Sequence, residues 1–401
     1  MSFIANRLSV VKPSASMAVS QAAKKLKAQG IDVVDLGLGE PDFATPPHIV
    51  EAANMAAVEG QTLYTVAAGT LPLREAIRDK FSKENGLDYS TDEIIVSNGA
   101  KQIIFNALMA TLNDGDEVIL PAPYFVSYPE MVKLLGGVPV VPPCDASCGF
   151  RLTAELLEAS ITEKTKWVFL NNPGNPSGVV YERQELERLG EVLERHPQVH
   201  VLSDEIYEHI VFDNKPFISF INACPRLRNR CLTVNGVSKA YAMTGWRVGY
   251  ACGDTTLIRA MATVQSQSVT SVCSIAQAAS VAALTGPQDE VLRFRQAFER
   301  RRNLVVDGIG QVSPLTLDIP EGAFYAYIGC EALIGAETPQ GLILENDVDV
   351  TSYLLDVGRV AAVPGAAYGL SPFFRISTAT SDLVLKEALE RIAAAVEQLK
   401  F

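Results

Sequence analysis

Short apolar runs alternate with amphipathic stretches along most of this chain. The apolar runs that favour strands lie at 93–96, 117–120, 138–141, 167–170, 200–202 and 231–234. Helical patterns separate several of them, for example at 182–195, and further helices are expected at 16–30, 255–266 and 271–284. Strands that alternate with helices are typical of an α/β fold, in which chemistry gathers at the ends of the strands.

The pattern changes near residue 288. Residues 288–310 predict a long amphipathic helix, and after it short strands such as 373–377 alternate with helices, as in a small α+β domain. A chain of 401 residues also exceeds the usual size of a single core. We expect an N-terminal arm with part of a small domain at 1–45, a large domain at 46–287 and a small C-terminal domain at 288–401.

Composition and charge narrow the choice of partners. The net charge is −12 without a basic cluster, which argues against nucleic acid, and no apolar run is long enough to cross a membrane. The N-terminus lacks the pattern of a signal peptide, and the seven scattered cysteines fit reduced thiols of a cytoplasmic protein. The four histidines show no spacing typical of metal ligands, so we expect no metal site.

The segment 235–250, NGVSKAYAMTGWRVGY, carries the most suggestive pair of side chains. It follows an apolar run, so Lys239 is expected on a loop at the end of a strand. Small and apolar neighbours would lower the pKa of this amine and make it a nucleophile for a carbonyl group. Arg247 offers a guanidinium fork for a phosphate. A solvated lysine and a salt-bridged arginine are the alternative for the pair taken alone.

Two glycine turns provide places where backbone can meet a ligand. The turn after the run at 93–96 leaves the backbone N–H groups of Gly99, Ala100 and Lys101 at the start of a helix, which is a typical phosphate site. Gly39, in the GLGEPD stretch, permits close approach of a ligand to the chain. A plain connection between strand and helix, and a plain β-turn, are the alternatives.

Polar and aromatic candidates lie on other loops between strands and helices. Asn175 is held rigidly in NNPGNPSG, and Asp204 and Tyr207 in SDEIY should point to one side of a starting helical turn. Asp204 can equally be a helix cap. Phe125 can cover the face of a bound ring or belong to the core.

Together these residues match the needs of pyridoxal 5′-phosphate. Its aldehyde needs a lysine, its ring nitrogen an acid, its ring oxygen hydrogen-bond donors, and its phosphate backbone amides and an arginine. The chain also resembles the class I aminotransferases of fold type I, particularly the bacterial aspartate aminotransferase branch. The resemblance covers almost the whole chain and is carried by NNPGNPSG, SDEIY and SKAYAMTGWRVGY.

The resemblance implies a large, mostly parallel, doubly wound sheet domain with a smaller α+β domain, and a role for each candidate residue. Lys239 would form the Schiff base with the cofactor, Asp204 would pair with the ring nitrogen, and Tyr207 and Asn175 would bond the ring oxygen. The residues expected around the phosphate and on the ring are Gly99, Ala100, Lys101, Arg247 and Phe125. Those expected at the substrate are Arg375, which would grip the α-carboxylate, with Gly39, Asn175 and Phe125.

The resemblance also implies a homodimer with shared active sites, because Tyr64 matches a tyrosine that reaches the cofactor phosphate of the neighbouring subunit. The expected reaction is ping-pong transfer of an amino group from an L-amino acid to a 2-oxo acid such as 2-oxoglutarate. A β-lyase or an oxidase on the same scaffold is the alternative, and a cofactor-sensing regulator is a weaker one.

Three positions depart from the family pattern. Phe125 stands where aspartate-preferring relatives commonly have Trp, and Thr378 stands where close relatives often have Tyr. Gly236 replaces a phosphate-binding serine of the animal-type branch, which favours the bacterial branch. The first two departures leave aspartate-type, aromatic and mixed substrates open.

Overall fold

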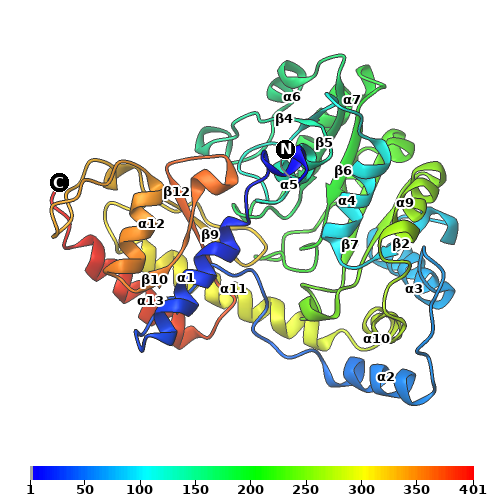
Figure 1. The fold of residues 1–401 in the computed structure, drawn as a ribbon, viewed down its shortest axis with the longest axis horizontal. Helices are drawn as coiled ribbons and strands as arrows, with labels where there is room; N and C mark the ends of the chain where they lie inside the picture. Colours follow the sequence, from blue (N-terminus) through cyan, green and yellow to red (C-terminus); the bar gives the residue numbers. More distant parts are fainter. Residues whose placement is uncertain (1–2) are drawn as a thin grey trace.

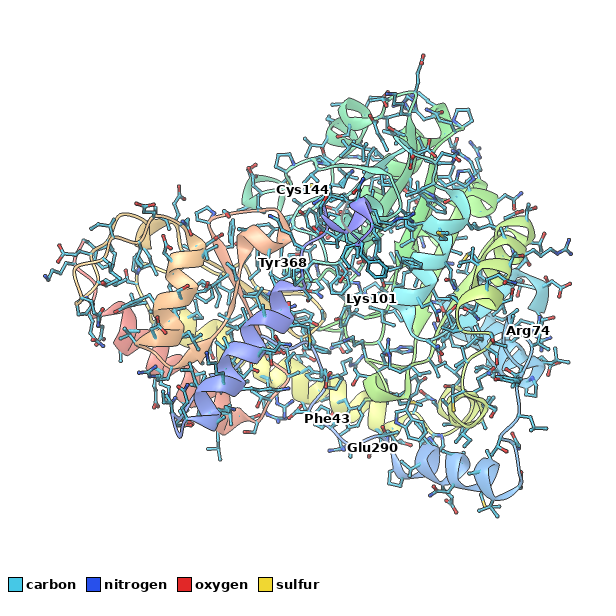
Figure 2. All side chains as sticks on the ribbon, viewed as in Figure 1. Phe43, Arg74, Lys101, Cys144, Glu290 and Tyr368 are labelled. Carbon is cyan, nitrogen blue, oxygen red and sulfur yellow. The ribbon has the colours of Figure 1, made fainter. Side chains whose placement is uncertain are left out.

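The computed structural model describes residues 3–401, so the first two residues of the expected arm lie outside the description. Figure 1 shows a large sheet with its helices beside a smaller group of strands and helices, and helix α1 (Ala15–Ala28) lies against the smaller group. Figure 2 shows labelled side chains on both parts: Lys101 belongs to the large part and Tyr368 to the small one. No helix within residues 3–401 is long and apolar enough to cross a membrane.

The large sheet has seven strands, and six of them run parallel. Strand β8 is antiparallel to both of its neighbours, β2 and β7. The carboxyl ends of the six parallel strands therefore lie at one edge, where α/β proteins bind ligands. In spatial order the strands are β2 (Ile94–Ser97), β8 (Gly249–Cys252), β7 (Cys231–Gly236), β6 (His200–Asp204), β5 (Thr165–Asn171), β3 (Glu117–Ile119) and β4 (Val138–Val140).

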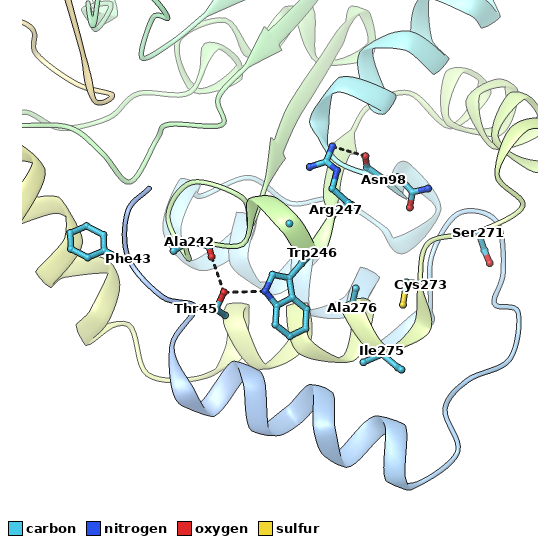
Figure 3. Close-up of a pocket in the computed structure, with 11 residues that line it drawn as sticks. Phe43, Thr45, Asn98, Ala242, Trp246, Arg247, Ser271, Cys273, Ile275 and Ala276 are labelled. Carbon is cyan, nitrogen blue, oxygen red and sulfur yellow. Dashed lines mark hydrogen bonds between the residues drawn. The ribbon is translucent and has the colours of Figure 1, made fainter. Parts of the chain in front are cut away.

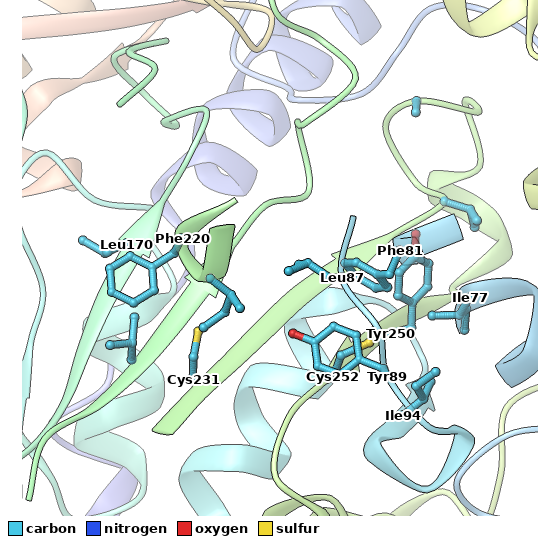
Figure 4. Packing of buried hydrophobic residues seen from close by; sticks show 14 of the residues in the cluster. Ile77, Phe81, Leu87, Tyr89, Ile94, Leu170, Phe220, Cys231, Tyr250 and Cys252 are labelled. Carbon is cyan, nitrogen blue, oxygen red and sulfur yellow. The ribbon is translucent and has the colours of Figure 1, made fainter. Parts of the chain in front are cut away.

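Helices cover both faces of this sheet. Side chains along a strand alternate between the two faces, so apolar residues on both faces are buried beneath helices. In β2, Ile94 and Val96 belong to one buried cluster and Ile95 to another. Figure 4 shows part of the first cluster, where Phe81 meets Tyr250 of β8. The helices of this part are α2 (Pro47–Val58), α3 (Leu71–Lys80), α4 (Ala100–Thr111), α5 (Tyr128–Leu134), α6 (Ala154–Ser160), α7 (Arg183–Arg195), α8 (Phe220–Ala223), α9 (Thr255–Ser268) and α10 (Ser274–Thr285).

The smaller part joins the two ends of the chain. Strand β1 (Val34–Asp35) pairs with β10 (Val360–Ala361), and a three-stranded antiparallel sheet has the order β11 (Val363–Pro364), β12 (Phe373–Ser377), β9 (Tyr325–Gly329). Helices α11 (Asp289–Ile309), α12 (Asp347–Asp356) and α13 (Asp382–Val396) pack in this part, together with α1. The expected α/β architecture with a large, mostly parallel sheet is confirmed. The domain boundaries at residues 45 and 287 stay a prediction.

Seven short 3₁₀ helices and one π-helical segment, η2, complete the described chain. They are η1 (Asn6–Leu8), η2 (Phe81–Asn85), η3 (Thr91–Glu93), η4 (Ala146–Cys148), η5 (Pro225–Arg230), η6 (Thr244–Trp246), η7 (Glu331–Leu333) and η8 (Gly365–Tyr368).

The segment after β6 differs from the sequence-based expectation. It does not start a helix: the N–H of Glu208 bonds to the carbonyl of Glu205 at 3.0 Å, and the N–H of Ile210 bonds to Tyr207 at 2.8 Å, which makes consecutive turns. Glu205 is drawn into the core instead, where its carboxylate accepts bonds from Ser203 and Ser219 at 2.8 Å each.

Candidate active site

A cavity of about 600 Å³ lies at the carboxyl edge of the large sheet. Ten of the residues that the sequence singled out line it: Gly39, Ala100, Lys101, Phe125, Asn175, Asp204, Tyr207, Lys239, Arg247 and Arg375. Gly99 lies directly beside it, at the N-terminus of α4. Tyr64 lies elsewhere, on an exposed loop. The fold therefore brings distant segments together: Arg375 donates to the carbonyl oxygen of Gly37, 338 residues away and two residues before the candidate Gly39.

Lys239 stands on the loop that follows β7, as expected from its sequence. Its ammonium group donates to the carbonyl oxygen of Gly39 at 2.6 Å. Burial lowers the pKa of Lys239 to about 8; the carboxylate of Glu40 opposes this effect and the charge of Arg375 supports it. A larger fraction of this amine is therefore neutral near physiological pH than in a solvated lysine, which makes it available as a nucleophile.

Asp204 ends β6 and is almost completely buried at the floor of the cavity. Burial raises its pKa, while a hydrogen bond from Tyr128 at 2.6 Å and one from the N–H of Ile206 at 3.3 Å oppose the rise. Since no full counter-charge contacts it among the described residues, this carboxylate is suited to pair with a protonated nitrogen of a ligand.

Helix α4 and Arg247 together form an anion site. Gly99 precedes the helix with φ +90°, and a Cβ atom there would lie 2.4 Å from Nη2 of Arg247. Arg247 donates to the carbonyl oxygens of Thr244 at 2.8 Å and Asn98 at 3.1 Å, which holds its guanidinium beside the helix N-terminus. Free backbone N–H groups next to a fixed guanidinium are typical of a phosphate site.

Arg375 on β12 approaches the cavity from the small sheet. Its guanidinium donates to the side-chain oxygen of Asn175 at 3.1 Å and to the carbonyl of Gly37 at 2.5 Å. Its Nε is buried and has no hydrogen-bond partner among the described residues. A buried donor without a partner is costly, so an anionic ligand here would satisfy an existing need.

Two tyrosines that the sequence analysis did not single out belong to the cavity. Tyr128 bonds to Asp204, and Tyr325 lies with its hydroxyl 2.7 Å from that of Tyr207. A sequence signal for Tyr325 exists: it alternates with Tyr327 in an apolar strand, which predicts that both are buried. A buried tyrosine hydroxyl usually has a hydrogen-bond partner. Nothing in the sequence identifies that partner, since Tyr207 is 118 residues away.

The three departures lie in or near the cavity. The Phe125 ring contacts Tyr128 edge to face at 5.5 Å, and the ammonium of Lys101 lies 5.2 Å from its centroid. Thr378 is buried, and its hydroxyl has no partner among the described residues. Gly236 faces Gly249, whose Cα would be 3.0 Å from an added Cβ, so a side chain there needs the strands to move.

A second hollow of about 780 Å³ also has Arg247 in its wall (Figure 3). Its wall includes Trp246, whose indole N–H donates to Thr45 at 3.0 Å, and Thr45 in turn donates to the carbonyl of Ala242 at 2.8 Å. Gly245 and Arg247 line both cavities, so the two share part of their wall at the anion site.

One group of possible metal ligands occurs in the described chain: Glu84, Glu208 and His209. The ammonium of Lys80 forms ion pairs with both glutamates, and its contact with Glu208 is very short. Because this cation already occupies the carboxylates, we do not assign a metal here. The expected lack of a metal site stays a prediction.

Comparisons with known proteins agree with this geometry. The family model for aminotransferase class I and II matches residues 31–392. An aspartate aminotransferase of Rhizobium meliloti strain 1021 is 54% identical over 395 residues, covering 98% of this chain and 96% of the relative. An aspartate/prephenate aminotransferase of Cereibacter sphaeroides is 52% identical, covering 98% of both chains.

Solved structures give the same result. The crystal structure of the aspartate aminotransferase from Rhizobium meliloti superposes with a TM-score of 0.97 at 53% identity and covers 100% of both chains. An aspartate aminotransferase from Thermus thermophilus with maleate has a TM-score of 0.91 at 42% identity, covering 98% of this chain and 100% of that one. The chain therefore belongs to the aminotransferase class I and II family.

Proposed function

We propose that this aminotransferase uses pyridoxal 5′-phosphate and transfers the amino group of an aspartate-type L-amino acid to a 2-oxo acid such as 2-oxoglutarate. The observation that carries the proposal is the buried amine of Lys239, whose pKa is lowered to about 8, in a cavity that also holds Asp204, Arg247 and Arg375. Membership of the family favours transamination over the β-lyase and oxidase alternatives.

The residues of the cavity fit this cofactor. When bound, pyridoxal 5′-phosphate supplies an aldehyde for a lysine amine and a ring that accepts an electron pair. Asp204 lacks a full counter-charge that a protonated ring nitrogen would provide. The N-terminus of α4 (Gly99, Ala100 and Lys101) and Arg247 would bind the phosphate. Tyr207 and Asn175 would donate to the ring oxygen, and Phe125 would cover the ring.

The chain's own groups then divide the work. Arg375 binds the substrate α-carboxylate and fixes the orientation of the Cα–H bond, and the backbone of Gly39 and Asn175 border the same place. The amine of Lys239 would act as general base at the substrate Cα: it would hold the α-proton and release it again, while the bound cofactor would supply the electron sink. Its lowered pKa suits both steps, because an amine that titrates near pH 8 can accept and release a proton at neutral pH.

The lining of the cavity contains four cationic side chains, Lys101, Lys239, Arg247 and Arg375, and two carboxylates, Glu40 and Asp204, which suits a cofactor phosphate and a substrate α-carboxylate. The relatives support an aspartate-type side chain on the substrate. The similar proteins named above are aspartate and aspartate/prephenate aminotransferases, and one of them was solved with maleate. Phe125 and Thr378 stay the positions at which the preference can differ from that of these relatives.

We further propose a cytoplasmic homodimer in which Tyr64 of one subunit reaches the phosphate bound by the other. Tyr64 is 89% exposed, and its neighbours Leu63 and Val66 are 80% and 64% exposed. Apolar side chains gathered on one loop are typical of a protein interface. The hollow of Figure 3, which has Arg247 in its wall, offers such a loop a route to this residue.

The test is a set of half-reactions. Purified protein loaded with the cofactor is mixed with single amino acids, and the loss of the absorbance band of the bound aldehyde form is followed. We expect rapid conversion by aspartate and glutamate and none in Lys239→Ala, which also lacks the band. Lys164→Ala, which removes an exposed lysine, is the matched control.

The outcomes separate the alternatives. Conversion chiefly by aromatic amino acids keeps the mechanism and changes the substrate. Release of ammonia or peroxide without need of an oxo acid favours the lyase or oxidase. Full activity of Lys239→Ala contradicts the assignment of the nucleophile.

A further inference from the structure

Two buried tyrosines join the large sheet to the small one at the cavity. Tyr207 follows β6, and Tyr325 begins β9. Their hydroxyl oxygens are 2.7 Å apart, and their rings meet edge to face at 5.8 Å. Both side chains are at most 3% exposed, so water does not replace this contact.

Tyr325 also contacts the substrate side of the cavity. The guanidinium carbon of Arg375 lies 4.4 Å from its ring centroid, which is a cation–π distance. The two residues are diagonal neighbours on paired strands, because Arg375 is opposite Tyr327 and Ser377 is opposite Tyr325. Removing the Tyr325 ring therefore removes a support of Arg375.

The hydroxyl of Tyr325 has a second neighbour, Gly39. A Cβ atom at Gly39 would lie 2.2 Å from it, so the backbone of Gly39 rests directly against this oxygen. The carbonyl of Gly39 is the acceptor for Lys239. One phenol thus contacts the residue that binds Lys239, the tyrosine assigned to the ring oxygen and the arginine assigned to the carboxylate.

We propose that Tyr325 is a positioning residue: its hydroxyl fixes and polarises that of Tyr207, and its ring holds Arg375 in place for the substrate. The inference rests on the proposed function, in which Tyr207 donates to the ring oxygen of the cofactor. Each phenol has one proton. If Tyr207 gives its proton to the ring oxygen, the proton between the two tyrosines must come from Tyr325.

This arrangement makes Tyr207 a better donor. In a chain of hydrogen bonds, a donor that itself accepts a bond is polarised, by about 10–30% per bond. The ring oxygen of the cofactor is anionic, so a hydrogen bond donated to it stabilises the deprotonated form of the bound cofactor. This lowers the pH at which the bound cofactor loses its proton and its absorbance changes. Weaker donation moves that transition to higher pH.

The hydroxyl is tested with Tyr325→Phe, which keeps the ring and removes only the oxygen. We expect the absorbance transition to move up by about 0.2–0.6 pH units, against about 1–2 for Tyr207→Phe, which removes a whole bond to an anion. The double variant should match Tyr207→Phe alone. Tyr353→Phe, which removes a buried hydroxyl bonded to Ala395 at 2.7 Å in the small part, is the control and should not move it.

The ring is tested with Tyr325→Leu against Tyr325→Phe. Only the leucine variant should raise the KM for the carboxylate substrate, by about threefold to tenfold, because only it loses the cation–π contact. Affinity of the apoprotein for pyridoxal 5′-phosphate, followed by tryptophan fluorescence, gives a readout independent of turnover and should fall for Tyr325→Phe and for Tyr207→Phe.

The outcomes distinguish the two levels of the argument. If Tyr207→Phe moves the transition and Tyr325→Phe does not, the inference is wrong and the proposed function stands. The inference is also wrong if the shift in the double variant equals the sum of the two single shifts, because Tyr325 would then act independently of Tyr207. If neither single variant moves the transition, the assignment of Tyr207 fails, and the inference fails with it.

Discussion

Replacing Glu208 by Gln leaves the ammonium of Lys80 in the core with its main counter-charge removed. The two side chains are 4% and 0% exposed, and the carboxylate of Glu208 also accepts bonds from Asn85 at 2.8 Å and Asn235 at 2.7 Å. Burial alone works to raise the pKa of Glu208, but the charges of Lys80 and His209 and the hydrogen bonds from Lys80 and Asn85 lower it from 4.5 to about 2.

The magnitude follows from this pKa. Each tenfold change in proton affinity equals about 1.4 kcal/mol, so the ionised carboxylate contributes about 3 kcal/mol to the free energy of unfolding. Breaking a buried ion pair costs about 3–5 kcal/mol in general. Glu84 stays 3.6 Å from Lys80 and compensates in part, which favours the lower figure. With an unfolding entropy of about 2.1 cal/mol/K per residue over 401 residues, Tm falls by about 4 °C.

The assay is thermal unfolding of Glu208→Gln at several pH values. Because the folded pKa is depressed, the stabilisation is complete above pH 4.5 and is lost as the pH falls toward 2, so the difference from the unaltered protein should shrink on acidification. Lys80→Met with Glu208→Gln should recover part of the loss. Glu158→Gln, which removes an exposed partner of Arg195, should change nothing measurable. An unchanged Tm in Glu208→Gln refutes the reasoning. So does a double variant whose loss of stability equals the sum of the losses in Lys80→Met and Glu208→Gln.

Three further outcomes are expected. Gly99→Ala should weaken cofactor binding at least about tenfold, because its Cβ would lie 2.4 Å from Nη2 of Arg247 and displace the guanidinium from the anion site; Gly115→Ala, at φ +87° in open space, has a similar backbone strain without this displacement and is the control in an affinity titration. Arg375→Ala should raise the KM for the amino acid about a hundredfold through the loss of charged hydrogen bonds, and an unchanged KM would contradict the carboxylate role. Covalent attachment of the cofactor to the apoprotein should accelerate as the pH rises through about 8 and then level off, since only the neutral amine of Lys239 reacts; a rate still rising above pH 10 would show an ordinary lysine.

Local patterns were sufficient to predict where several residues of the candidate site lie in the fold. An apolar run that ends in small residues marks the carboxyl end of a strand, which is why Lys239, Asp204 and Gly99 were expected at loops and lie at one edge of the sheet. The structure gives a reason for glycine at this turn, because Gly99 has a φ of +90°.

Contacts between distant segments were not accessible from the same patterns. Nothing in the periodicity of 249–252 distinguishes an antiparallel strand from a parallel one, since both are buried on two faces. Tyr325 and Tyr128 look like core residues in the sequence, and their chemistry arises only from partners 118 and 76 positions away. The turn after β6 was misjudged because Glu205 bonds to Ser219 and Phe220, which a helical pattern does not reveal.

The antiparallel direction of β8 has a consequence for insertions and deletions. Because β7 ends and β8 begins at the same edge, the segment 237–248 leaves the sheet and returns to it without crossing to the far side. Both of its ends are anchored in central strands, so an added or deleted residue would alter the spacing between Lys239 and Arg247. The loop before β3, at the opposite edge, carries no such constraint. Length variation among enzymes of this design should therefore be absent from 237–248 and tolerated at 113–116.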